Sequence, residues 1–140
     1  MEISAVRKGL AAVVAAAIPE LNCFGYVPNS IPEPAFVAGE VEVDFNKAMN
    51  RGLDQVSVRC RVLVSRAEDE AGQALLDAYL SGSGPESIRA AIEGTPGVSQ
   101  TLGGVCDDLV VERIRGYRMY TVAGTEFYGA EFLVTVIGKG

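Results

Sequence analysis

Residues 36–66 read FVAGEVEVDFNKAMNRGLDQVSVRCRVLVSR and carry the clearest pattern in the chain. Apolar and polar residues alternate one by one on both sides of a polar connector at residues 46–53. Strict alternation is typical of a β-strand that buries one face. We therefore predict two antiparallel strands with an apolar face that another part of the chain covers. That face carries Val37, Gly39, Val41, Val43 and Phe45 in the first strand and Val56, Val58, Cys60, Val62 and Val64 in the second.

The opposite face of this strand pair is acidic in the first strand and basic in the second. It carries Glu40 and Glu42, followed by Arg59 and Arg61. Opposite charges that face each other across antiparallel strands are mildly stabilising. These four residues are either a solvated face with paired charges or part of a docking surface.

A helix at residues 4–18 is predicted to cover the apolar face. Ser4 can cap its start, and Pro19 disfavours helical backbone at the preceding residue, so the helix should end there. The apolar run at 10–18 also resembles a weak signal peptide, but it is mostly alanine and too short to span a bilayer. The helix is the better interpretation because its apolar residues recur on one helical face. They are Val6, Leu10, Val13, Val14, Ala17 and Leu21.

Two further helices are predicted after the strand pair. Ser65 and Glu68 have the spacing of a capping box, and the acids at 68–70 suit the start of a helix better than a metal site. A Ser/Gly run ends that helix. A short helix at 87–93 follows, and Gly94 ends it.

A second strand pair closes the chain, at residues 109–122 and 125–137. Ala123 and Gly124 between them form a plausible tight turn, and Gly116 marks a possible bulge. The last strand is apolar on both sides, which indicates a central strand or one in an interface. Its partner strand carries a cluster of arginines, Arg113, Arg115 and Arg118, which is a second candidate docking surface.

These elements predict a single α+β domain that spans residues 1–140. Two hairpins should form an antiparallel sheet of four strands, or slightly more, with helices packed on one face. The predicted order is αββααββ.

Residues 22–34 fit neither a helix nor a central strand, because they hold three prolines and one glycine. Their apolar side chains nevertheless need a partner. This segment is either a loop pinned to the core or an arm that packs on a neighbouring subunit. In the second case the interface residues are Phe24, Tyr26, Val27 and Ile31.

The composition argues against catalysis and against a cofactor or metal. Lys and Arg total 12 and Asp and Glu total 18, so the net charge of −6 disfavours a general grip on nucleic acid. Histidine is absent, which removes the commonest general base and transition-metal ligand. Cys23, Cys60 and Cys106 lack metal or redox spacing, and Asp107 and Asp108 are explained by a turn or strand start. We therefore predict a protein that is not an enzyme.

Several short motifs occur in order along nearly the whole chain. They are GYVPNS at 25–30, PA at 34–35, LVSRA at 63–67, SIRAA at 87–91, TLGG at 101–104 and YGAE at 128–131. This ordered set resembles the tail terminator proteins of long-tailed phages, especially phages that infect actinobacteria.

The resemblance implies a virion structural protein at the head-proximal end of the tail, made in the host cytoplasm. Such a protein caps the tail tube as a homohexameric ring, stops tube polymerisation and offers a surface to the neck or connector proteins of the head. DNA only passes through its channel, and no cofactor or membrane is involved. Two alternatives stay open, namely another phage neck or head–tail completion protein and a small-ligand-binding α+β module.

Overall fold

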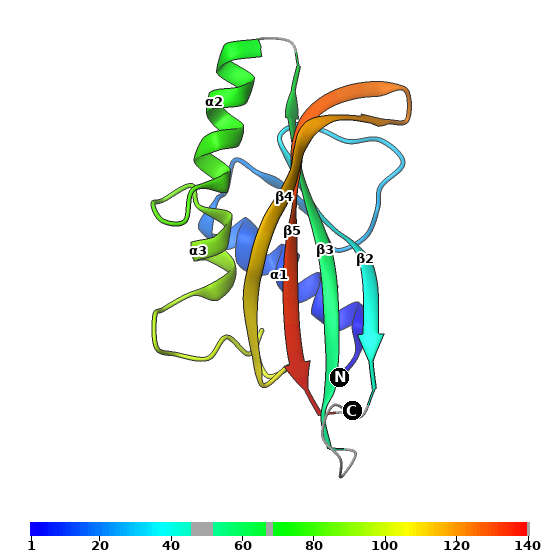
Figure 1. Cartoon of the computed structure of the whole chain (residues 1–140), viewed down its shortest axis with the longest axis vertical. Helices are drawn as coiled ribbons and strands as arrows, with labels where there is room; N and C mark the ends of the chain where they lie inside the picture. Colours follow the sequence, from blue (N-terminus) through cyan, green and yellow to red (C-terminus); the bar gives the residue numbers. More distant parts are fainter. Residues whose placement is uncertain (46–51, 67–68, 140) are drawn as a thin grey trace.

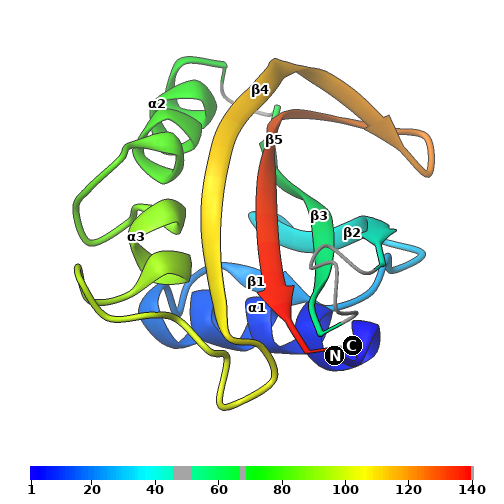
Figure 2. The same cartoon turned by 60° about the horizontal axis from the view of Figure 1, so that its bottom comes forward.

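The computed structural model describes residues 1–45, 52–66 and 69–139, which form an α+β fold (Figure 1). Within these residues, three helices gather along one side of a strongly curved five-stranded sheet (Figure 2). In chain order the elements are α1 (Ile3–Ala17), β1 (Asn22–Phe24), β2 (Ala35–Asp44), β3 (Asp54–Ser65), α2 (Asp69–Leu80), α3 (Ile88–Glu93), β4 (Asp108–Val122) and β5 (Thr125–Gly138).

The sheet is mixed and has the strand order β1-β2-β3-β5-β4. The prediction of a four-stranded antiparallel sheet in the order αββααββ is therefore wrong, because β1 adds a strand that pairs parallel to β2. β1 has only three residues, too few to show a period, and it lies in the proline-rich segment. Asn22 stabilises the pairing by donating from its backbone N–H and its side-chain Nδ2 to the carbonyl of Pro34, at 3.0 and 3.1 Å.

A β-bulge in β2 changes which side chains face the core. Ala38 pairs with Cys60 and Val41 pairs with Val58, so Gly39 and Glu40 together oppose a single β3 residue. The predicted apolar face was therefore wrong in its first half. Val37 and Gly39 lie on the opposite face from Val41, and the core positions before the bulge belong to Phe36 and Ala38.

The core lies between the sheet and the helices, as predicted. Leu10 of α1 and Val58 and Cys60 of β3 are fully buried in one hydrophobic cluster. Val41 and Val43 are only partly buried at its edge, so the prediction that they are core residues is confirmed in part.

The second hairpin also matches its prediction. Ala123 and Gly124 have φ angles of 51° and 82°, and positive φ at both positions is what a two-residue type I′ turn requires. Gly116 has φ 69° and lies in the register shift between Arg115 and Arg118. β5 is an interior strand between β3 and β4, which explains why it is apolar on both sides.

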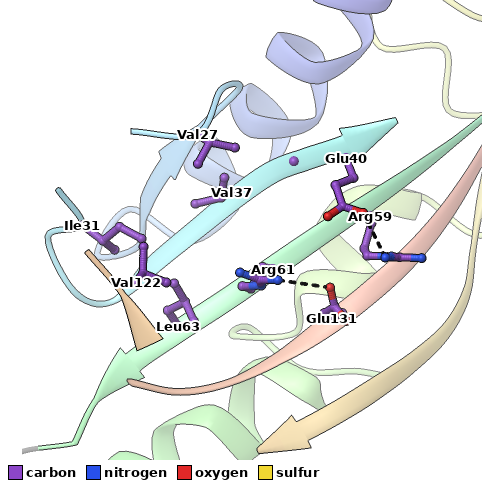
Figure 3. A pocket seen from close by; sticks show the side chains of 10 residues that line it. Val27, Ile31, Val37, Glu40, Arg59, Arg61, Leu63, Val122 and Glu131 are labelled. Atoms are coloured by element: carbon purple, nitrogen blue, oxygen red, sulfur yellow. Dashed lines mark hydrogen bonds and ion pairs between the residues drawn. The ribbon is translucent and has the colours of Figure 1, made fainter. Parts of the chain in front are cut away.

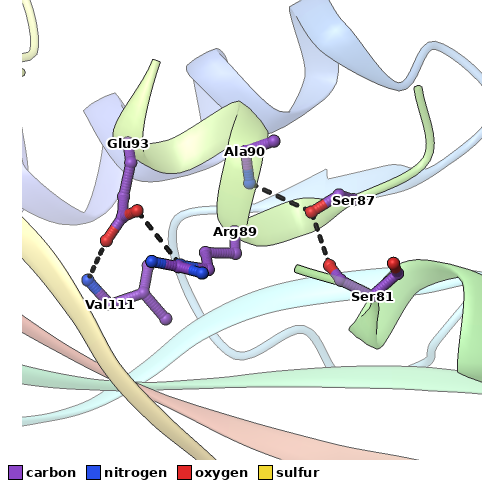
Figure 4. A network of polar contacts seen from close by, with 6 residues as sticks. All are labelled: Ser81, Ser87, Arg89, Ala90, Glu93 and Val111. Carbon is purple, nitrogen blue, oxygen red and sulfur yellow. Dashed lines mark hydrogen bonds and ion pairs between the residues drawn. The ribbon is translucent and has the colours of Figure 1, made fainter. Parts of the chain in front are cut away.

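The sequence signals that predicted the end of α2 and both ends of α3 are confirmed. Ser87 caps α3 by accepting a hydrogen bond from the backbone N–H of Ala90 at 3.1 Å, and Gly94 ends the helix (Figure 4). α2 ends at Leu80, before the Ser/Gly run. Ser65 of the predicted capping box is the last residue of β3, whereas Glu68 and most of the connector at 46–53 lie outside the described residues.

Candidate functional site

One face of the sheet points away from the helices, and the strand register shows which side chains it carries. Cross-strand partners project from the same face. Arg61 of β3 pairs with Glu131 of β5, and Glu131 pairs with Arg115 of β4. We call this surface the open face and define it by Arg59, Arg61, Leu63, Arg113, Arg115, Arg118, Tyr120, Phe127, Glu131 and Leu133.

Two ion pairs cross the open face. Arg59 Nη1 lies 2.9 Å from Glu40 Oε2, and Arg61 Nη2 lies 3.5 Å from Glu131 Oε2. The first pair is the predicted cross-strand contact between the acidic and basic strands. Glu42 takes no part in it, because the register sets it opposite Ser57. Ion pairs as exposed as Arg59–Glu40 contribute little to stability.

The predicted arginine cluster lies on the same face, along the edge strand β4. Arg113, Arg115 and Arg118 are all exposed, and no ion pair joins any of them to another described residue. The Arg118 guanidinium lies 4.1 Å from the centre of the Tyr120 ring, and that of Arg61 lies 4.6 Å from it. Both are cation–π contacts. The open face is therefore locally rich in positive charge, although the chain as a whole carries −6.

Tyr120 holds the bulge that presents these arginines. Its hydroxyl donates a hydrogen bond of 2.6 Å to the Gly116 carbonyl. A Cβ atom at position 116 would lie only 2.6 Å from this hydroxyl, and one at Gly129 would lie 2.9 Å from the tyrosine ring. Both glycines therefore make room for Tyr120. The sequence pattern indicated the bulge at Gly116 but not its tyrosine partner.

A pocket of about 190 Å³ opens on this face (Figure 3). Side chains of the 22–34 segment form part of its apolar end, together with residues from β2, β3 and the tip of β4. The charged end is formed by the two ion pairs of the open face. The apolar lining comprises Val27, Ile31, Val37, Leu63 and Val122, and the charged lining comprises Glu40, Arg59, Arg61 and Glu131.

The predicted interface residues of the 22–34 segment fall into two groups. Ile31 packs against the small apolar cluster of the open face, and Phe24 is half-buried in β1, with its ring edge-on to that of Tyr26. Tyr26 and Val27 are 59% and 64% exposed. The segment is therefore pinned to the fold by some of its apolar residues, while others stay uncovered.

The pocket was not predicted, because its lining comes from the 22–34 segment and from all four strands β2, β3, β4 and β5, which only the fold brings together. Its charged end did have a signal in Glu40, Arg59 and Arg61. Its apolar end had only Val27 and Ile31 as candidates, and nothing in the sequence placed them beside Val122.

The thiols offer no nucleophile at neutral pH. Burial raises the pKa of Cys60 to about 12 and that of Cys23 to about 11. Burial, followed by the nearby carboxylates of Asp107 and Asp108, also raises the pKa of Cys106. All three groups are thus protonated thiols, and the thiol is the unreactive form.

The described part of the chain holds no cluster of side chains suited to a metal ion. Asp108 uses Oδ1 to accept the backbone N–H of Leu109 at 2.9 Å, as a strand-start residue does. Among the residues described, no helix has the length and apolar character needed to cross a membrane.

Comparison with known proteins leaves the family open. A scan against protein-family models finds no match to the chain, and a search of curated proteins finds none either.

Proposed function

We propose that this chain is a phage tail terminator, which caps the finished tail tube as a homohexameric ring, stops tube polymerisation and presents a surface for head joining. The observation that carries this proposal is the open face. It combines exposed arginines, which have no ion-pair partner among the described residues, with exposed apolar side chains: Val27 at the pocket, and Val110 and Ile137, which the strand register places on the same face. Such a mixture is typical of a surface that meets other protein chains.

The difference in burial between the two faces of the sheet supports this role. The helix side buries the larger hydrophobic cluster, whereas the open face carries only the small cluster of Leu63, Tyr120 and Phe127. The open face is then available for contacts between subunits, with the tail tube protein or with the neck. Charge patterns on such surfaces set partner choice and register more than affinity. The net charge of −6 also suits a ring whose channel passes DNA without gripping it.

The pocket favours one alternative, a module that binds a small ligand. Its volume of about 190 Å³ is below the roughly 300–1,000 Å³ that is usual for such sites. Two ion pairs already occupy its charged end. We therefore rank the interaction surface above the ligand site.

Native mass spectrometry of the purified chain, followed by electron microscopy with purified tail tubes, tests the proposal. We expect a mass that corresponds to a homohexamer, alone or on tubes, and rings at one end of each tube. Tubes assembled with the protein should stop growing. A monomer that retains a copurified small molecule and ignores tubes would favour the ligand-binding module instead.

A further inference from the structure

We propose that the end of β2 that carries Phe45 docks into the open-face pocket of a second copy of this chain. The inference rests on the proposed function, because a ring requires one contact that repeats between identical subunits. It adds the residues of that contact, Phe45 on one side and the pocket on the other.

Phe45 is the more unusual of the two partners. It follows the last residue of β2 directly, and 71% of its surface is exposed. The two preceding apolar residues, Val41 and Val43, pack against the core. Two acidic residues, Glu42 and Asp44, precede the ring on the same strand and are exposed. We call this end of β2, an exposed aromatic side chain that follows two acidic residues, the knob.

The pocket is complementary to that knob in both chemistry and charge. Its apolar end, which includes Val27 and Val122, can receive an aromatic ring. Its charged end holds Arg59 and Arg61, which are already paired with Glu40 and Glu131. The positive charge available to an incoming carboxylate comes from Arg113 and Arg115 of the same face, which are exposed and have no ion-pair partner among the described residues.

Knob and pocket lie at opposite ends of β2, so one copy cannot fill its own pocket. Val37, near the start of the strand, lines the pocket (Figure 3). Phe45 directly follows the last residue of β2, and β2 ends near the C-terminus (Figure 1). A contact between two different patches of the same chain is heterologous. It generates a closed ring when the rotation closes and a filament when it does not.

Two variants test the two sides of this contact one at a time. Phe45→Ser removes the knob and leaves the pocket intact. Val27→Glu places a carboxylate at the pocket's apolar end, where it repels the acidic knob, and Val27 is exposed enough for the fold to tolerate the change. Each variant alone should associate roughly tenfold more weakly or worse, as expected for loss of a buried anchor. Val98→Ser is the matched control, because Val98 is also 64% exposed but lies away from the pocket lining.

Mixing the two variants gives the sharpest result. The knob of the Val27→Glu chain meets the intact pocket of the Phe45→Ser chain, so native mass spectrometry should show a one-to-one pair and nothing larger. The inference is overturned if the mixture stays monomeric, if either variant assembles like the wild type, or if the wild type is monomeric at the highest soluble concentration.

Tube length tests the proposed function separately from this contact. If both variants still form rings that cap tubes, this contact is wrong and the terminator proposal stands. If the wild type forms only a two-chain complex through this contact and never caps tubes, the contact stands and the terminator proposal fails.

Discussion

Tyr120 sets the shape of the open face through its hydroxyl and its ring. The hydroxyl bonds the Gly116 carbonyl in the bulge, while the ring covers Gly129 and receives two guanidinium groups. Burial is the main reason that the pKa of Tyr120 is raised, so the hydroxyl remains a donor well above neutral pH. This one side chain therefore couples the bulge to the arginines.

Tyr120→Phe should remove the hydroxyl contact and keep the ring in place. We expect the free energy of unfolding to fall by about 0.5–1.5 kcal/mol, the usual net value of a hydrogen bond, as measured by urea denaturation. Tyr117→Phe is the matched control, because it also loses one hydrogen bond, to Asp77, but at an exposed site. Equal losses for the two variants would contradict the role given to Tyr120.

Cys60 makes stability depend on pH in the alkaline range. Burial raises its pKa from 9.0 to about 12. Between pH 9 and pH 12 the folded chain therefore keeps the thiol proton, while the unfolded chain releases it. The stabilisation is complete below pH 9 and is lost as the pH rises towards 12. Cys60→Ala should flatten the decline in unfolding free energy above pH 9, whatever its cost at neutral pH. An unchanged slope would show that Cys23 and Tyr79, whose pKa values are also raised, account for the decline.

At the scale of elements, α3 shows how a local contact positions a whole segment. Ser87 is buried, accepts the N–H of Ala90 and donates to the Ser81 carbonyl at 2.6 Å (Figure 4). Glu93 at the other end of the helix accepts the N–H of Val111 at 3.0 Å. α3 thereby joins α2 to the edge strand β4.

Ser87→Ala should lower the free energy of unfolding by roughly 1–2 kcal/mol, because it removes a helix cap and the hydrogen bond to the Ser81 carbonyl. Thermal or urea denaturation measures the change. Ser83→Ala lies in the same connection but at an exposed position, and it should change stability by only a few tenths of a kcal/mol. A wild-type midpoint for Ser87→Ala would contradict the cap.

The elements that were predicted well depend on nearby residues. α3 has its own cap and glycine stop, and the β4–β5 turn has residues that tolerate positive φ. β1 and the β2 bulge were missed for the opposite reason. β1 exists only because Ala35 and its neighbours offer a partner strand, and the bulge changes the phase of an alternation that still looks regular in sequence.

At the scale of the whole molecule, the sequence predicted the arginine cluster of the candidate site but not its pocket. The arginines cluster within one strand, so sequence alone placed Arg113, Arg115 and Arg118 together. The pocket requires the fold, because it forms where the 22–34 segment meets four strands of the sheet. The resemblance to tail terminators carried no information on this pocket.

Tyr26→Ala tests whether the uncovered part of the 22–34 segment lies between subunits. Tyr26 is 59% exposed, so its truncation should barely change monomer stability. Assembly of the oligomeric ring should weaken by roughly tenfold if the Tyr26 side chain is buried against a neighbouring subunit. Analytical ultracentrifugation compares the two chains, and intact rings for the variant would place this residue outside the interface.

Charge on β4 tests whether the open face docks the ring to its partners. Arg113 pairs with Leu133 in the register, so Arg113→Glu brings no new like-charge pair. Arg115 stands opposite Glu131, and Arg115→Gln removes its charge without creating repulsion there. Arg118 is left intact because it stacks on Tyr120.

The double variant of Arg113→Glu and Arg115→Gln should keep native circular dichroism but lose docking to tubes or neck, so that tubes are overlong or lack heads in electron micrographs. Arg89→Gln is the control, because Arg89 is exposed on α3, on the helix side of the sheet. Normal tube lengths and normal head joining in the double variant would show that these arginines only solvate the sheet.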